Sequence, residues 1–260
     1  MKSIFLYIFL FLFFTYSSSA NSFRILTNEE PPTNYLDENK IITGITVDIV
    51  KKLQEELNLE NKIELMTWAR AYNIAQNNAN IALFTAGKTS YRIQEGFYFI
   101  GPVITKKHIL YSKSNKNISI NSSLDIKSKD LKIAAMRGDW RAKYFKDKGF
   151  EVYETANHEQ NIKKLMLERV DLWTSSNIEA AFIAKKAGIK VSSLKASYEF
   201  KEIPSYIMLS KDTSKEDVRR WQKAFFDLQK TDFFEKTAKK WSLILDIDLQ
   251  YSKYKGFYKN

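Results

Sequence analysis

Short apolar runs alternate with helix-like segments along the first third of the chain. The runs at 23–26, 62–66 and 81–84 are too short to be helices of their own and predict strands, the last of them fully buried. Between them, 45–59 carries its apolar residues on one face and Lys and Glu on the other, and 71–78 has the length of a short helix. Strand and helix therefore alternate, which predicts a parallel sheet with right-handed crossovers.

The same alternation starts again after Gly101-Pro102 and predicts a second α/β unit. Its expected strands are 108–112, 131–136, 170–174 and 189–191, and its expected helices are 140–148, a segment that starts at Asn157, and 176–188. Segment 115–129 is polar and loop-like. A strand at 206–209 leads back to the first unit, and the helices expected last are 214–228 and 232–241. Residues 247–260 are rich in Lys and Tyr and show no clear period.

Three loops follow the first strands, at 27–35, 67–72 and 85–92. Ligands of open α/β sheets bind beyond the carboxyl ends of the strands, so these loops hold the candidate binding residues. The candidates in or beside them are Glu30, Trp68, Arg70, Tyr72, Thr85, Gly87 and Arg92. Arg92 is the strongest, because a planar guanidinium grips a carboxylate with two parallel hydrogen bonds. The alternative is a surface arginine in a screened ion pair.

The first twenty residues have the pattern of an export signal. Lys2 supplies a positive start, residues 4–16 are apolar apart from Thr15, and Ser18-Ser19-Ala20 offers a cleavage site. The apolar run is shorter than a spanning helix needs, although a retained membrane anchor is the alternative. We therefore expect residues 1–20 to be removed and the mature protein to reside in the periplasm.

Composition excludes several kinds of chemistry. The chain has no cysteine, so it has no disulfide, no lipid-bearing cysteine and no thiolate nucleophile or metal ligand. Its two histidines, His108 and His158, are not at the spacing of a metal pair, and we expect no metal and no cofactor. The net charge of +11 comes from lysines spread along the chain, which favours a solvated surface and no nucleic-acid partner. A pair of carboxylates is the one enzymatic alternative left open.

Seven segments in order resemble the bacterial extracellular solute-binding proteins of family 3, the receptors of polar amino-acid ABC importers. These segments are FRILTNEEPPTNY, GITVDIVKKLQEELNL, TAGKTSYR, GPVITKKHILYSK, IAAMRGDW, ERVDLW and TAKKWS. The resemblance implies a monomer with a two-lobed, type II periplasmic-binding-protein fold, each lobe a mainly parallel sheet flanked by helices. Lobe 1 would comprise 22–103 plus 206–246 and lobe 2 would comprise 107–203, with the chain crossing near 104–106 and 203–205.

The resemblance also assigns site residues. Arg92 falls in a T-x-x-R turn where the family binds the ligand carboxylate, and Trp68 falls near an aromatic that lines the pocket; a core tryptophan is the alternative. Gly138-Asp139, with Arg137 and Trp140 on either side, matches a helix start that meets the same carboxylate. The chain departs from the family here, because Asp139 replaces Ser or Thr. Its charge repels an anion unless Arg137 or Arg92 offsets it, or it is only a cap.

A second departure concerns recognition of an amine. Ser176 stands where amino-acid receptors carry an aspartate for the ligand ammonium, so an ordinary amino acid held in the usual way is in doubt. The motif Trp68-Ala69-Arg70-Ala71-Tyr72 instead resembles a subgroup with no assigned ligand. Arg70 and Arg92 hint at an anionic ligand, Glu30 and Asp139 could receive an amine, and Arg70 could instead brace the helix start.

The resemblance implies a non-enzymatic receptor that binds a small polar, carboxylate-bearing, amino-acid-like solute between its lobes. We expect it to present that solute to an ABC permease. The alternative is the same fold acting as a ligand-sensing adaptor for a membrane signalling protein.

Overall fold

The computed structural model describes residues 23–260, so the expected export signal lies outside the described residues. Within that range the helices are α1 (Ile45–Leu57), α2 (Trp68–Asn77), α3 (Ser90–Gln94), α4 (Ser123–Ser128), α5 (Trp140–Asp147), α6 (His158–Met166), α7 (Glu179–Lys186), α8 (Lys215–Leu228) and α9 (Phe233–Leu245), with a 3-10 turn at Val191–Ser193. No helix of this part of the chain has the length and apolarity needed to cross a bilayer.

The strands of the same range are β1 (Arg24–Thr27), β2 (Tyr35–Leu36), β3 (Ile42–Thr43), β4 (Ile63–Leu65), β5 (Ile81–Gly87), β6 (Tyr98–Lys113), β7 (Ile133–Met136), β8 (Val152–Thr155), β9 (Leu172–Ser176), β10 (Leu194–Leu209), β11 (Gln250–Ser252) and β12 (Gly256–Tyr258). Ten of them form one curled sheet, in which eight follow the order β4-β1-β5-β10-β6-β9-β7-β8 and the other two, β11 and β12, are attached through β6. The expected α/β class is thereby confirmed.

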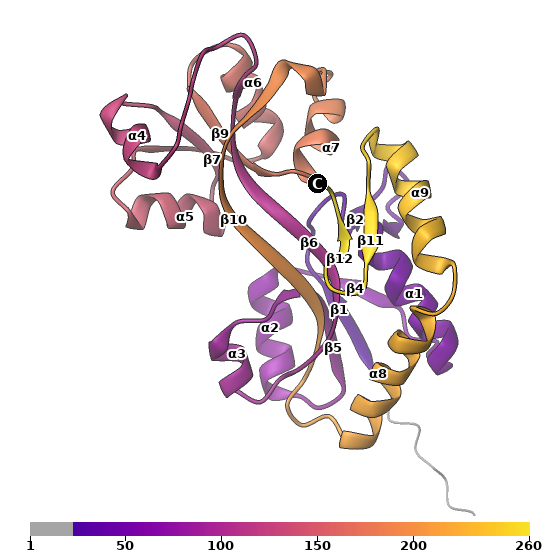
Figure 1. Ribbon diagram of the computed structural model, residues 1–260. Coiled ribbons are helices and arrows are strands. Elements are labelled where there is room, and N and C mark those ends of the chain that lie inside the picture. The colour runs from indigo at the N-terminus through magenta and orange to yellow at the C-terminus, as the bar shows by residue number, and fades with distance from the viewer. Residues whose placement is uncertain (1–22) are drawn as a thin grey trace, which may run out of the picture.

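Two long antiparallel strands, β6 and β10, join the two ends of the molecule (Figure 1). One end carries β1, β4 and β5 with α1–α3, α8 and α9, and we call it the first lobe. The other end carries β7–β9 with α4–α7, and we call it the second lobe. The expected short strands 108–112 and 206–209 are parts of β6 and β10, so both predicted crossings fall inside continuous strands. The register of β10 on β6 shifts at three places, between Ala196 and Tyr198, Glu199 and Lys201, and Ser205 and Ile207.

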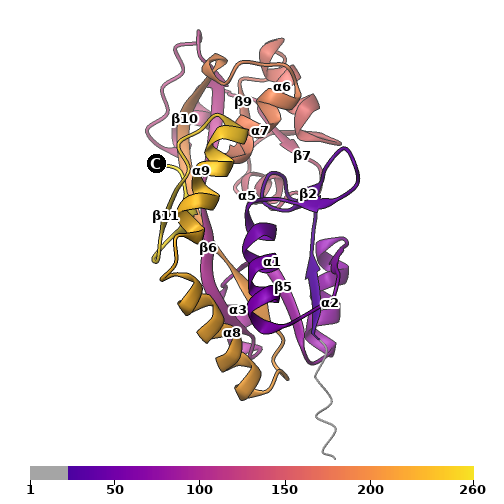
Figure 2. The ribbon, with the colours of Figure 1, turned by 90° about the vertical axis from the view of Figure 1, so that its right-hand side faces the viewer.

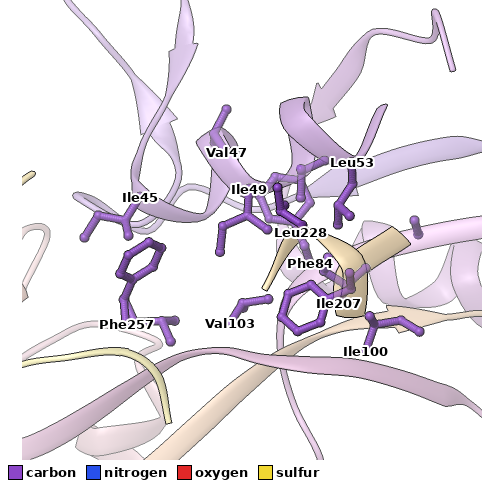
Figure 3. Close-up of a cluster of buried hydrophobic side chains, with 14 of the residues drawn as sticks. Ile45, Val47, Ile49, Leu53, Phe84, Ile100, Val103, Ile207, Leu228 and Phe257 are labelled. Carbon is purple, nitrogen blue, oxygen red and sulfur yellow. The ribbon is translucent and has the colours of Figure 1, made fainter. Parts of the chain in front are cut away.

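Each lobe packs helices on both faces of its sheet. In the first lobe α1, α8 and α9 cover one face, where Ile49, Phe84, Ile207 and Phe257 are among the buried side chains (Figure 3). Helix α2 covers the other face. In the second lobe a core around Trp173 lies between the sheet and α6 and α7, and a core around Phe145 lies on the opposite face. The 3.6-residue spacing of apolar positions predicted these buried faces.

Three local expectations were wrong. The expected strand at 189–191 is replaced by the 3-10 turn at Val191–Ser193. The loop-like segment 115–129 contains the short helix α4, whose start is fixed because the Asp125 carboxylate accepts a hydrogen bond from the Ser122 N–H, 3.1 Å away. Strand β8 was not predicted, because its four residues have no apolar run.

The Lys- and Tyr-rich segment after α9 is ordered, although it shows no period in sequence. Strands β11 and β12 form a hairpin, drawn in yellow beside α9 in Figure 2. Strand β12 pairs with β6, where Phe257 lies opposite Ile104. Phe257 is fully buried, and Tyr251 stacks on Phe234 with ring centroids 4.1 Å apart. Gly256 has φ +66° and lies so close to Val103 that a Cβ would come within 2.3 Å of its carbonyl carbon. Glycine is therefore required at this turn.

Candidate functional site

The strand register brings the carboxyl ends of the two lobes face to face. Gly87, at the end of β5, pairs with Ser205, which pairs with Ile104 of β6. Ser176, at the end of β9, pairs with His108 of β6. Strands β5 and β9 run in opposite directions, and their ends are four residues of β6 apart, about 13 Å at roughly 3.3 Å per residue. We call the region between these strand ends the interlobe site.

Arg92 is held in the first lobe, where its charge helps lower the pKa of Glu95 after the larger effect of the hydrogen bond from Tyr72. Helix α3 starts at Ser90, and its N-cap Thr89 accepts a hydrogen bond from the Arg92 N–H. The guanidinium donates to the Gly87 carbonyl at 2.6 Å and lies over the rings of Trp68 and Tyr72, 4.7 and 5.0 Å from their centroids. Among the described residues it forms no salt bridge, so the ion-pair alternative is not observed. Its other N–H groups remain available for an anion.

Helix α2 begins at Trp68, three residues earlier than the sequence predicted. Trp68 and Tyr72 are therefore one turn apart and stack with ring centroids 5.8 Å apart, and both are partly buried. The Tyr72 hydroxyl donates to the Glu95 carboxylate; burial and this carboxylate raise the pKa of Tyr72 to about 12. Arg70 is exposed, about 200° around the helix from both aromatics, and its charge lowers the pKa of Glu64 after the larger effect of Arg24. The structure therefore does not bring Arg70 and Arg92 together.

Thr85 adopts a backbone conformation that is rare for a β-branched residue. Its φ is +66°, in the left-handed region, where the side chain crowds the backbone. Buried hydrogen bonds hold it there: the Thr85 hydroxyl donates to the Asn34 side-chain oxygen at 2.6 Å and lies 3.2 Å from the Thr46 hydroxyl. These contacts fix the turn that carries Gly87 and tie it to the loop that carries Glu30. Such strain is more common at binding sites than elsewhere.

Glu30 is paired inside the protein, with a lysine that sequence reasoning missed. Its carboxylate accepts a hydrogen bond from the Lys106 ammonium, and the Lys106 side chain is only 5% exposed. Lys106 lies on β6 between Ile104 and His108, that is, between the two sets of strand ends. The available signal was the polar stretch around Lys106 and Lys107 between two apolar runs of one strand, but no spacing rule indicated Glu30 as the partner of Lys106.

In the second lobe, Asp139 caps α5 and is neutralised by an arginine that was not predicted to do so. Its carboxylate accepts from the Arg141 backbone N–H at 2.8 Å and from the Arg141 side chain at 3.0 Å. Arg141 also donates to Glu179 at 2.6 Å, and all three side chains are buried. Burial opposes ionisation of both carboxyls, but the Arg141 charge outweighs it and lowers both pKa values. Of the two possibilities that the sequence left open for Asp139, the structure shows the helix cap, and Arg141 offsets its charge in place of Arg137 or Arg92.

The other predicted site residues of the second lobe lie near Asp139, Arg141 and Glu179. The buried Ser176 hydroxyl accepts from the Glu179 N–H at 3.0 Å and so caps the start of α7. Arg137 and Gly138 are exposed; the hydrogen bond from Lys146 lowers the pKa of Glu154 most, and the Gly138 N–H and the Arg137 charge add to this effect. The backbone donors at the start of α5 thus already meet carboxylates of the chain itself.

Trp140 is 41% exposed and covers a histidine that sequence reasoning considered only as a metal ligand. The His108 ring lies edge-on to Trp140, with centroids 4.8 Å apart, and is tilted against Phe200. Its Nδ1 is buried and has no hydrogen-bond partner among residues 23–260. Burial, with the charges of Arg141 and Lys106, lowers the pKa of His108 to about 3. His108 is therefore neutral at pH 7.

A separate hollow of about 720 Å³ lies between α1 and the C-terminal helices, on the outer side of the first lobe. Lysines and carboxylates along it pair with one another: Lys52 with Glu55, Lys236 with Asp232, and Lys240 with Asp48. The hollow offers no concentration of one charge, so we place the candidate site at the strand ends.

A family model for bacterial extracellular solute-binding proteins, family 3, matches residues 23–244. The chain belongs to this family. Solute-binding proteins of the family bind small solutes such as amino acids. Among the curated proteins, no sequence matches the chain.

Solved structures of binding proteins share the fold. A histidine kinase sensor domain with similarity to periplasmic binding proteins has a TM-score of 0.69 at 15% identity, over 84% of this chain and 95% of that chain. An ancestral amino acid-binding protein, a precursor of cyclohexadienyl dehydratase, has a TM-score of 0.68 at 19% identity, over 84% and 94%. The arginine-, lysine-, histidine-binding protein of Geobacillus stearothermophilus has a TM-score of 0.64 at 16% identity, over 84% and 94%. At these identities the likeness concerns the fold alone.

Proposed function

We propose that this family 3 protein works in the periplasm, where it captures a small, carboxylate-bearing solute at the interlobe site and presents it to an ABC importer. The observation that carries the proposal is Arg92. Its guanidinium is fixed by Gly87 and two aromatic rings, and it forms no salt bridge with the described residues, although its charge acts on Glu95. A prepositioned cation of this kind binds a carboxylate without having to break an internal ion pair first.

The lobes would close over the solute by a hinge at 104–106 and 203–205. These segments lie between the facing strand ends, and β10 changes register on β6 between Ser205 and Ile207. Domain closure about a few residues at the ends of elements is a common response to ligand. The proposal assigns no catalytic step, because its residues only bind and orient the solute.

The test compares two arginine variants in a thermal-shift screen with amino acids, organic acids, polyamines and small peptides. We expect R92A to unfold normally but to lose the ligand-induced rise in Tm, and R70A, its matched control, to keep it. Equal responses of the two variants would remove Arg92 from the site. Small-angle scattering should show a smaller radius of gyration with saturating ligand, and an unchanged radius would argue against closure.

A second candidate function is a ligand-sensing adaptor for a membrane signalling protein. The likeness in fold to a histidine kinase sensor domain favours it, because the same closure would then report the solute to a kinase. A permease and an ATPase encoded beside this protein would support import, whereas a sensor kinase or cyclase would support sensing.

A further inference from the structure

The carboxylates around the interlobe site are already paired within the protein. Glu30 accepts from Lys106, and Asp139 and Glu179 both accept from Arg141. Glu29, next to Glu30, is exposed, so it offers an ammonium only the weak attraction of a screened surface charge.

Lys106 lies where a bound amine would find its acceptor. It is on β6 midway between the pairing partners of the β5 and β9 ends, and its Nζ contacts the carboxylate of the loop after β1. The Lys106 side chain is 5% exposed and that of Glu30 is 35% exposed, so opening the pair would leave the lysine charge buried without its partner. Breaking a buried ion pair leaves an uncompensated charge, which is strongly unfavourable.

The groups left to a solute are cationic and aromatic. Arg92 has no salt-bridge partner among the described residues, and Lys88 lies over the rings of Phe99 and Tyr206, 5.8 Å from each centroid. In the second lobe the exposed Trp140 is flanked by Lys201, 5.7 Å from its centroid. An ammonium bound here would meet like charges and, apart from the exposed Glu29, no carboxylate without an internal partner, whereas a carboxylate on an apolar body would meet complementary groups.

We propose, as a refinement that rests on the proposed function, that the solute is a carboxylate without an ammonium group. Lys106 is the specificity-determining residue, because its own ammonium occupies the Glu30 carboxylate that a ligand amine would need. The protein therefore discriminates against amino acids and favours their desamino counterparts.

Matched pairs of acids test this directly on the full mature protein. The pairs are 3-phenylpropanoate with L-phenylalanine, glutarate with L-glutamate, and 4-methylpentanoate with L-leucine, each measured by thermal shift and calorimetric titration. We expect the desamino acid of at least one pair to bind tenfold or more tightly than its amino acid. This comparison needs no variant, so it does not depend on whether a variant folds.

Two variants then locate the cause. K106M leaves the Glu30 carboxylate without its lysine. It should therefore reduce or reverse the preference for the desamino acid over its amino acid. K107M, its matched control, alters the adjacent lysine, whose partner is Glu199, and should leave the preference unchanged. Tighter binding of the amino acid to the unaltered protein would overturn the inference and leave the proposed function standing. Absence of binding by all six acids would also overturn it, and the proposed function would then be judged by the wider screen and by scattering.

Discussion

Replacing His108 with phenylalanine should make the protein less sensitive to acid. His108 is 6% exposed, its Nδ1 has no partner in the described chain, and it lies between the aromatic rings of Trp140 and Phe200. Phenylalanine keeps an aromatic ring in that position but removes the imidazole, which binds a proton in the unfolded chain at acidic pH. The charges that face the ring come from Arg141, Lys106, Glu179 and Asp139.

The magnitude follows from the two pKa values. His108 titrates at about 3 in the folded protein, below its ordinary value of 6.5. Between these two pH values the unfolded chain binds a proton at His108 that the folded protein does not bind. The stability that the protein owes to a neutral His108 is therefore complete above pH 6.5 and is lost as pH falls. Between pH 7.5 and pH 5.0 the loss is about 2 kcal/mol of unfolding free energy. Any folded-state pKa below about 4 gives nearly the same figure, because the folded form is then neutral at both pH values.

The assay is urea unfolding of both proteins at pH 7.5 and pH 5.0, followed by circular dichroism. The larger ring of phenylalanine adds a packing effect, but that effect is the same at both pH values. The quantity to compare is therefore the change in H108F minus the change in the unaltered protein. We expect H108F to lose about 2 kcal/mol less on going to pH 5.0. A difference within a few tenths of a kcal/mol of zero would show that His108 is not held neutral by its surroundings.

Two further predictions concern buried groups. R141M leaves the buried carboxylates of Asp139 and Glu179 without their arginine, with His158 as the neighbour that contacts both, and should cost about 3–5 kcal/mol at pH 7.5 and less at pH 5.0, where the carboxylates protonate more readily. K143M, on the exposed side of α5, is its control in urea unfolding. F257A should cost about 3–5 kcal/mol by opening a cavity in the first-lobe core, and a loss below about 1 kcal/mol would mean that the hairpin contributes little to stability.

Periodicity and length predicted the fold because each lobe has its apolar residues where a parallel sheet needs them. The run Ile81–Phe84 is β5, and the helical spacing at 45–59 is α1. The start of α2 was missed because Trp68-Ala69-Arg70 has no apolar period of its own, and Trp68 becomes helical through stacking on Tyr72. Gln250–Ser252 and Gly256–Tyr258 are too short to show a period of two, and they become strands only through pairing with each other and with β6.

The charge state of the site could not be predicted from the sequence. Glu30 and Lys106 are 76 residues apart, and Arg141 and Glu179 are 38 apart, so no local rule joins them. The expectation that Glu30 and Asp139 receive a ligand amine did not include their partners within the protein, Lys106 and Arg141. Which side chains are free is decided by tertiary pairing, and this determines the chemistry that a binding site offers.

The C-terminal hairpin connects hinge motion to stability. The Thr105 hydroxyl, within the proposed hinge, donates to the Lys255 carbonyl at 2.6 Å, and the Asn177 amide of the second lobe donates to the Lys259 carbonyl at 2.8 Å. Phe257, between these contacts, is buried in the core of the first lobe. The hairpin is thus anchored in one lobe and hydrogen-bonded to the other, so the proposed closure would either carry it along or break the bond to Asn177. Ligand affinity would then include the free energy of that adjustment, which a change at the interlobe site alone would not reveal.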